Sequence, residues 1–199
     1  FDNERHVYGE ARYPAQLVLQ DVLTLHGSRF KDAALIVASP PCQEFSYMAM
    51  PWSKAKQIER EYRDGTRDTA KLTALFDACF RIQREACEAA GHHIPLVVEN
   101  VCGAQKWVGR AQWHSGSLYF WGDVPARLPT YRHVKMPGLD WNRFKRGDPS
   151  YRGEAFNTRR AANKRLSAAL SAKIPAEISR HVARCFTPSH SEVQYGHHS

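Results

Sequence analysis

The sequence has no long apolar run, and its first residues do not lead us to expect a secretory leader. No stretch of about 18 or more apolar residues occurs among its 199 residues, so no transmembrane helix is expected. The opening FDNERHVYGE lacks the basic stretch and apolar core of a signal peptide. These absences favour a cytoplasmic protein without a membrane partner.

The sequence also lacks paired cysteines. Its five cysteines are an odd number, and none has CxxC spacing, which argues against a disulfide framework and a closed zinc site. We expect a reducing compartment and no bound metal. Four of the five are expected to be packing residues: Cys79, Cys87, Cys102 and Cys185.

Acidic residues are in the minority. The 28 Lys and Arg residues exceed the 20 Asp and Glu residues, which gives a formal net charge of +8. Hydrophobic residues make up 43% of the chain, enough to bury a core, so a disordered chain is not expected. A basic folded chain favours a polyanionic partner, most often nucleic acid and less often an acidic membrane surface.

The hydrophobic pattern predicts a βαβ unit. Residues 33–38 (AALIVA) are a short apolar run typical of a strand buried on both faces. The polar residues 43–68 predict a long loop that could hold one helical turn or more, and residues 69–90 have helical periodicity that ends at Gly91. Residues 94–98 (IPLVV) predict a second buried strand.

The other elements are less sharply marked. Residues 117–121 (SLYFW) predict a third strand, and residues 15–25 could hold a short helix or a strand. Residues 166–186 predict a helix with a break or a first position at Pro175. We therefore expect an α/β fold, with a Rossmann-like, mostly parallel sheet flanked by helices and a small irregular lobe.

Two chemically distinctive groups follow the predicted buried strands. Cys42 follows the first strand and two prolines, and Glu99 directly follows the second strand. Functional groups in open α/β sheets gather at the carboxyl ends of the strands. We therefore expect the thiol and the carboxylate to lie close together on one edge of the sheet.

The residues around this pair resemble a known family. Pro41-Cys42-Gln43 and Glu99-Asn100-Val101, each after an apolar strand and in this order, are similar to the catalytic motifs of the DNA (cytosine-5) methyltransferases. GSLYFWGDVP at 116–125 is similar to short phage or prophage members, whose roles include restriction-modification. The resemblance covers roughly residues 1–125 and, more weakly, 166–186.

The resemblance implies a covalent mechanism. Cys42 would add to carbon 6 of a flipped-out cytosine, which makes carbon 5 nucleophilic enough to take a methyl group. Glu99 would donate a hydrogen bond to ring nitrogen 3, and burial would have to raise its pKa for that role. Arg110 is a candidate for holding the flipped base, although the Gln-x-Arg-x-Arg pattern of the family is not met.

The resemblance also implies the cofactor S-adenosylmethionine. Asp2 matches an acidic residue that would hold the ribose, Asp21 one that would accept from the adenine amino group, and Pro40 would line the same site. The Phe-x-Gly-x-Gly loop of the family is missing from these residues. We therefore expect either further residues upstream of Phe1 or a chain that cannot bind the cofactor alone.

Double-stranded DNA is the expected partner of a monomer. Residues 131–165 combine basic and aromatic side chains, which suits a target-recognition segment. The expected regions are a catalytic domain (1–125), a recognition segment (126–165), a returning helix (166–187) and a tail (188–199). Candidate DNA contacts are Gln43, Ser46, Lys54, Lys56, Arg132, Arg143, Arg159 and Arg160.

Two alternatives stay open. An amino-methyltransferase acting on cytosine or adenine would explain Ser39-Pro40-Pro41, but Cys42 replaces the aromatic residue that should follow. A non-catalytic DNA-binding module, or one half of a split enzyme, would explain the missing glycine-rich loop. The intact Cys42 and Glu99 count against that second alternative.

Overall fold

The computed structural model describes residues 18–43, 45, 52–130 and 174–187. The chain divides into two compact units, one formed by residues 1–19 and 132–175 and the other by residues 20–131 and 176–199. All the helices and strands described below belong to the second unit. Most of the predicted recognition segment lies outside the described residues.

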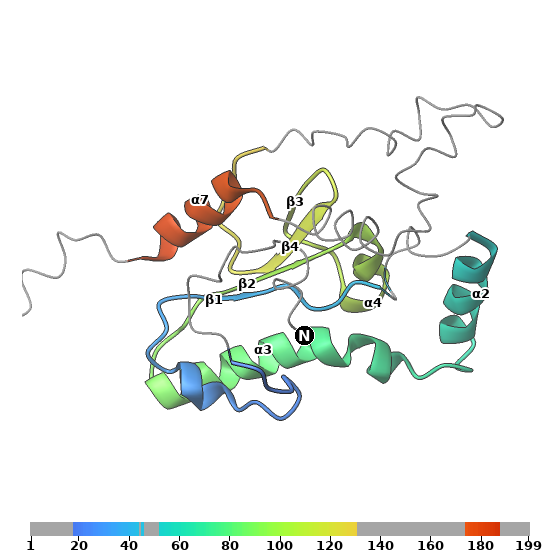
Figure 1. Cartoon of the computed structure of the whole chain (residues 1–199), viewed down its shortest axis with the longest axis horizontal. Coiled ribbons are helices and arrows are strands. Elements are labelled where there is room, and N and C mark those ends of the chain that lie inside the picture. Colours follow the sequence, from blue (N-terminus) through green and yellow to red (C-terminus); the bar gives the residue numbers. More distant parts are fainter. Residues whose placement is uncertain (1–17, 44, 46–51, 131–173, 188–199) are drawn as a thin grey trace, which may run out of the picture. The chain divides into compact units, whose positions relative to one another are not determined.

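A four-stranded mixed sheet forms the centre of this unit (Figure 1). Its strands are β1 (Ile36–Ala38), β2 (Leu96–Asn100), β3 (Trp113–Ser115) and β4 (Leu118–Gly122), in the order β1-β2-β4-β3. β1 and β2 are parallel, whereas β4 runs antiparallel to both β2 and β3. The α/β expectation is confirmed at this level, but the described sheet is not mostly parallel.

Two helices connect the parallel strands. Helix α2 spans Trp52–Arg63 and helix α3 spans Thr69–Ala90. Asp68 caps α3 by accepting a hydrogen bond from the Ala70 amide, and Gly91 ends it with a φ of 73°, a left-handed conformation that favours glycine. The predicted helix 69–90 is confirmed, while the predicted loop before it holds three turns of helix.

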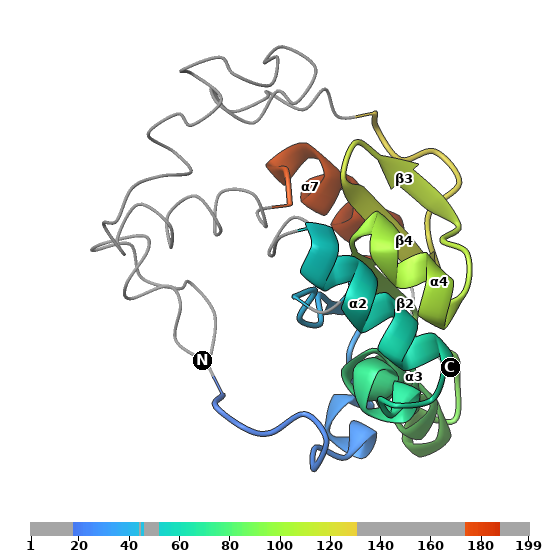
Figure 2. The ribbon, with the colours of Figure 1, turned by 90° about the vertical axis from the view of Figure 1, so that its right-hand side faces the viewer.

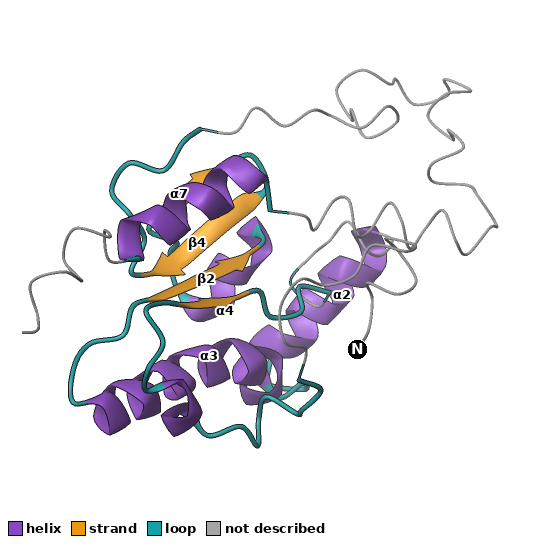
Figure 3. Ribbon diagram, turned by 60° about the vertical axis from the view of Figure 1, so that its left-hand side comes forward, coloured by secondary structure: helices purple, strands orange, loops and turns teal. Residues whose placement is uncertain are grey.

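The two faces of the sheet are covered by different helices. Helix α3 packs against one face, where the rings of Phe76 and Trp121 meet edge to face at 5.3 Å beside the buried Val98. Helix α7 (Ala176–Phe186) lies on the opposite face and buries Ile178 and Val182 (Figure 3). Its start directly after Pro175 agrees with the predicted break there.

Short elements fill the connections around the sheet. The 3-10 helix η1 (Gly27–Phe30) contacts α3, and η3 (Cys102–Ala104) runs into α4 (Gln105–Val108) after β2. Helices α2 and α4 lie beside each other at one end of the unit (Figure 2). None of the helices in the described ranges has the length and apolar character needed to cross a bilayer.

Two local expectations were wrong and one strand was not predicted. Val37 in β1 is 67% exposed instead of buried, and β1 is an edge strand with β2 as its only neighbour in the described sheet. Residues 18–25 form a turn and neither a helix nor a strand. Strand β3 was not predicted, because three residues carry too little periodicity to be recognised.

Two cysteines expected in the core are exposed. Cys102 begins η3 in the connection after β2, where the chain leaves the sheet. Cys185 lies in the last turn of α7, within 3.6 Å of His181 Nε2. Cys102 lies in a connection and Cys185 near the end of a helix, and the hydrophobic pattern of the sequence does not predict that side chains at these positions are exposed.

Candidate active site

Parallel pairing of β1 and β2 brings their carboxyl ends to one edge of the sheet. Ala38 pairs with Val98, so the connection after β1 starts beside Glu99 and Asn100, the last two residues of β2. That connection carries Cys42, whereas Glu99 still pairs with Phe120 of β4 and lies inside β2, one residue earlier in the element than the sequence predicted. This edge holds the thiol and the carboxylate that the sequence pattern singled out.

Cys42 and Glu99 are close enough to interact electrostatically. Both are partly buried, and burial followed by the Glu99 charge raises the pKa of the Cys42 thiol above its ordinary value. Burial raises the pKa of Glu99 to about 7, against a smaller lowering effect of a hydrogen bond with the Ser39 side chain. The condition that Glu99 be partly protonated near neutral pH is therefore met.

The loop that carries Cys42 is fastened to the last residue of β2. Asn100, which is 1% exposed, donates from Nδ2 to the Pro40 carbonyl at 3.0 Å and accepts from the Val101 amide through Oδ1 at 2.8 Å. On the other side of the thiol, the Phe45 amide donates to the Cys42 carbonyl at 3.0 Å. Cys42 is thus held between two anchored residues.

Gly103 allows this loop to approach closely. A Cβ atom at Gly103 would lie 1.9 Å from the Phe45 carbonyl oxygen, a distance that atoms in proteins do not adopt. The Phe45 side chain is 4% exposed and belongs to the core cluster. Only glycine fits at position 103 while Phe45 keeps its place beside Cys42.

The predicted DNA contacts fall partly within the described residues. Gln43 is exposed next to Cys42, and Lys54 and Lys56 are exposed on α2. Arg110 is exposed between α4 and β3, and within the described ranges no hydrogen bond joins its side chain to Cys42 or Glu99. The other predicted contacts lie outside the described residues, namely Ser46, Arg132, Arg143, Arg159 and Arg160.

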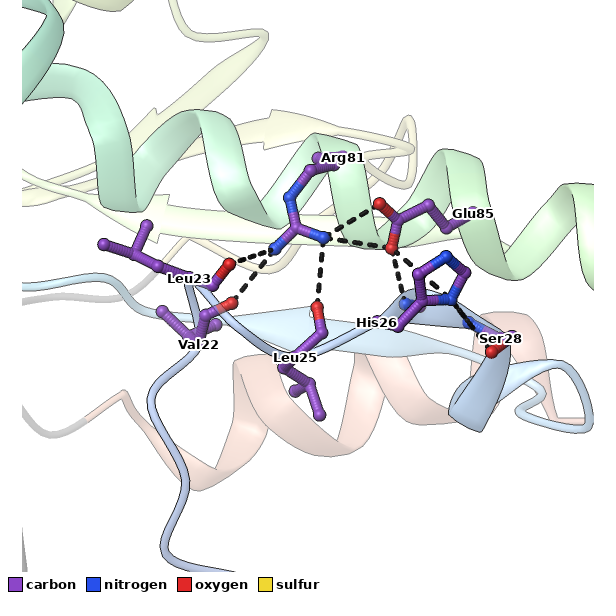
Figure 4. A network of polar contacts seen from close by, with 8 residues as sticks. Val22, Leu23, Leu25, His26, Ser28, Arg81 and Glu85 are labelled. Carbon is purple, nitrogen blue, oxygen red and sulfur yellow. Dashed lines mark hydrogen bonds and ion pairs between the residues drawn. The ribbon is translucent and has the colours of Figure 1, made fainter.

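Asp21 lies at the start of a turn that α3 holds in place. Its Oδ1 accepts from the Leu23 amide at 2.9 Å, and its side chain is exposed. Arg81 on α3 donates to the carbonyls of Val22 and Leu25 at 3.0 Å each (Figure 4). The turn that presents Asp21 is therefore tied to the same helix that packs under the sheet.

Glu85 completes this network. It accepts from the Gly27 amide at 2.6 Å and from Arg81 at 2.9 Å, and these two partners, in that order, hold the pKa of Glu85 below its ordinary value (Figure 4). Gly27 lies so close to α3 that a Cβ there would be 2.0 Å from the Ile82 carbonyl oxygen. This contact fixes η1 against α3.

The described residues offer only part of a cofactor site. Asp21 has an exposed carboxylate, but the Pro40 carbonyl already accepts from Asn100. Asp2 lies outside the described residues.

A second carboxylate, Glu59, lies on α2, the helix that follows the Cys42 connection. The sequence analysis did not single it out. Glu59 is 6% exposed on α2 and forms ion pairs with Lys56, Arg63 and Lys106. A hydrogen bond from Lys106, the largest cause, and one from Lys56 lower the pKa of Glu59 to about 2 despite its burial. The spacing of Lys56, Glu59 and Arg63 on one helix face was a signal for part of this cluster.

Comparison with known proteins adds no assignment, because no family model, no curated protein and no solved structure matches the chain.

Proposed function

We propose that this chain is a DNA (cytosine-5) methyltransferase in which Cys42 is the nucleophile and Glu99 is its acid partner. The observation that carries the proposal is the placement of these two side chains on one edge of the sheet, with the pKa of Glu99 raised to about 7. A carboxyl group with that pKa can hold a proton near neutral pH and give it to a base.

The two side chains would activate the cytosine ring together. The Cys42 thiolate forms a bond to carbon 6, and the electron pair displaced from the carbon 5–carbon 6 double bond moves toward ring nitrogen 3. Glu99 donates a proton or a strong hydrogen bond to nitrogen 3, which stabilises the charge that the addition creates. Carbon 5 then carries the electron density that a methyl transfer requires. After the transfer, a base would take the proton from carbon 5, the Cys42 thiolate would leave carbon 6, and the carbon 5–carbon 6 double bond would form again.

Two protonation states of the pair carry a single negative charge. The active one has a Cys42 thiolate beside a protonated Glu99. The other, a neutral thiol beside the Glu99 carboxylate, is the more populated, because the pKa of Cys42 is raised above its ordinary value and lies above that of Glu99. Activity should therefore depend on the singly charged pair, which exists between the pKa of Glu99, about 7, and the higher pKa of Cys42.

The proposal needs a methyl donor and a DNA duplex. The resemblance implies S-adenosylmethionine, whose sulfonium would supply an electrophilic methyl group. The target cytosine would have to leave the helix, since its carbon 6 is not accessible within a stacked duplex.

The test is a methyl-transfer assay with matched cysteine variants. Duplex DNA and S-adenosylmethionine labelled in the methyl group are incubated with the native chain, with Cys42→Ala and with Cys185→Ala, which removes an exposed thiol on α7. We expect label in 5-methylcytosine from the native chain and Cys185→Ala, and none from Cys42→Ala. Label in an exocyclic amino group would contradict the proposal.

A covalent trap gives an independent readout. A duplex with fluorine in place of hydrogen at carbon 5 of its cytosines cannot release the cysteine once the methyl group has been transferred. We expect a denaturation-resistant protein–DNA adduct that requires Cys42. An adduct formed equally well by Cys42→Ala would contradict the assignment of the nucleophile.

A further inference from the structure

Glu59 gathers three cationic side chains from two separate helices. Lys56 and Arg63 belong to α2, and Lys106 comes from α4, which follows the end of β2. The Lys106 ammonium lies 2.8 Å and the Arg63 guanidinium 2.9 Å from Glu59 Oε1, and the Lys56 ammonium lies 3.2 Å from Oε2. We call these three cations, with Glu59, the α2–α4 cluster.

In the α2–α4 cluster three cationic side chains share one carboxylate. The Lys106 and Arg63 nitrogens share one carboxylate oxygen, so they can be no more than about 6 Å apart, a separation at which like charges repel. A second anion on the solvent side would relieve that repulsion.

The exposed fractions of the four side chains suit an anion that binds from the solvent side. Glu59 itself is 6% exposed, whereas the side chains of Lys106, Lys56 and Arg63 are 41%, 47% and 68% exposed. The carboxylate is therefore covered, and the cations present their outer sides to solvent. Because Glu59 restrains all three, an incoming phosphate would find donors that are already placed.

The cluster lies near the edge of the sheet that carries Cys42 and Glu99. Helix α2 follows the Cys42 connection and α4 follows Glu99 and Asn100, so each helix is joined to one half of the candidate site. Helices α2 and α4 lie together at that end of the unit, away from the C-terminal half of α3 (Figures 1 and 2).

We propose that Lys56, Arg63 and Lys106, held in place by Glu59, bind phosphates of the DNA backbone beside the target base. This inference deepens the proposed function, on which the choice of duplex DNA as the ligand rests. Phosphate contacts fix the position of a protein on the duplex and make its affinity depend on salt, with a slope of about 0.9 per phosphate neutralised.

The experiment is the salt dependence of duplex binding, measured by fluorescence anisotropy with a labelled duplex and the full chain. The test variant combines Arg63→Ala with Lys106→Ala, which leaves Lys56 to balance Glu59. The control variant combines Arg29→Ala with Arg84→Ala, which removes the same charge from exposed residues of η1 and α3. A third variant, Arg63→Lys with Lys106→Arg, keeps the charge.

We expect the test variant to lower the slope of log affinity against log salt by about 2 and to weaken binding tenfold or more at about 0.1 M salt. The control and the charge-keeping variant should keep the native slope. Thermal melting identifies a variant that fails to fold; Lys106→Ala alone then replaces it and should lose about half as much slope.

Equal slopes for the test and control variants, or no duplex binding by the native chain, would overturn this inference. The methyl-transfer and trapping assays report on the proposed function separately. A chain that methylates DNA with an unchanged slope in the test variant would keep the proposed function and lose the α2–α4 cluster as its phosphate site. A chain with the expected slopes but no methyl transfer would keep the α2–α4 cluster as a phosphate site and lose the proposed function.

Discussion

Glu59 on α2 and Glu99 on β2 are both largely withdrawn from solvent, but their surroundings differ. Lys56, Arg63 and Lys106 form ion pairs with Glu59, and hydrogen bonds from Lys106 and Lys56 lower its pKa to about 2, whereas Glu99 has the Ser39 hydroxyl as a partner and a pKa of about 7. Burial raises the pKa of both carboxyls, but only for Glu59 do cationic partners outweigh it. A permanently charged carboxylate can hold other groups in place, while one that titrates near neutral pH can move a proton.

The largest contrast should be in catalysis. Glu99→Gln removes the proton donor, and we expect the rate of methyl transfer to fall by about 10² to 10⁴, the usual contribution of general acid–base catalysis. Glu59→Gln should keep the chemical step within a few-fold under saturating DNA, because Glu59 does not contact Cys42 or Glu99. Single-turnover rates for the two variants measure the difference. Equal losses would contradict the division of roles.

Stability should change in opposite directions for the same pair of variants. The burial of an ionised Glu99 is unfavourable, and its folded pKa of about 7 lies above its ordinary value of 4.5. The folded state is therefore destabilised as pH rises through this window, and the full penalty is present above about pH 7. Glu99→Gln removes the penalty, so we expect it to raise the free energy of unfolding by up to about 3 kcal/mol at about pH 8.

Glu99→Gln should change the free energy of unfolding much less at about pH 5, where Glu99 in the folded state is already protonated. Denaturant unfolding at the two pH values checks this. A loss of stability at the higher pH would show that Glu99 is held by favourable partners instead of being merely desolvated.

Glu59→Gln should destabilise the fold. It weakens three ion pairs and leaves three cations close together, and we expect a loss of about 1–2 kcal/mol near neutral pH. The folded pKa of Glu59 is depressed, so its contribution is present above the ordinary pKa of 4.5 and is lost as pH falls toward about 2. Unfolding measured at low and high salt gives a second check, since salt should reduce the loss.

The roles of the two carboxylates were not equally visible in the sequence. Glu99 lies at the carboxyl end of an apolar strand, and the parallel pairing of two such strands is enough to predict that it lies near Cys42. Glu59 depends on Lys106, which lies on another helix and far away along the chain. Helical spacing predicts Lys56 and Arg63 as its neighbours, but not the third cation that covers it.

The fold shows the same division between local and long-range information. Helix α3 could be predicted with its ends because its periodicity, its Asp68 cap and its Gly91 stop are all local. The pairing of β4 beside β2 and the exposure of Val37 depend on the order of strands in the sheet. Gly103 has no local signature, because its need for glycine comes from the close approach of Phe45.

The smallest expected effect in the comparison of Glu59 with Glu99 concerns Ser39. Its hydroxyl forms a hydrogen bond with Glu99 and lowers the pKa of that carboxyl. Because the active pair carries one negative charge, the low-pH limb of kcat/KM should follow the ionisation of Glu99. Ser39→Ala removes a partner of the ionised form, so the pKa of Glu99 should rise and the limb should move to higher pH by less than about one unit. Ser39→Thr keeps a hydroxyl and should leave the limb near its native position.

A low-pH limb that does not move in Ser39→Ala, or that moves to lower pH, would mean that the Ser39 hydroxyl does not stabilise the Glu99 carboxylate. The local environment of Glu99 would then be set by burial alone, which would make its contrast with Glu59 sharper still.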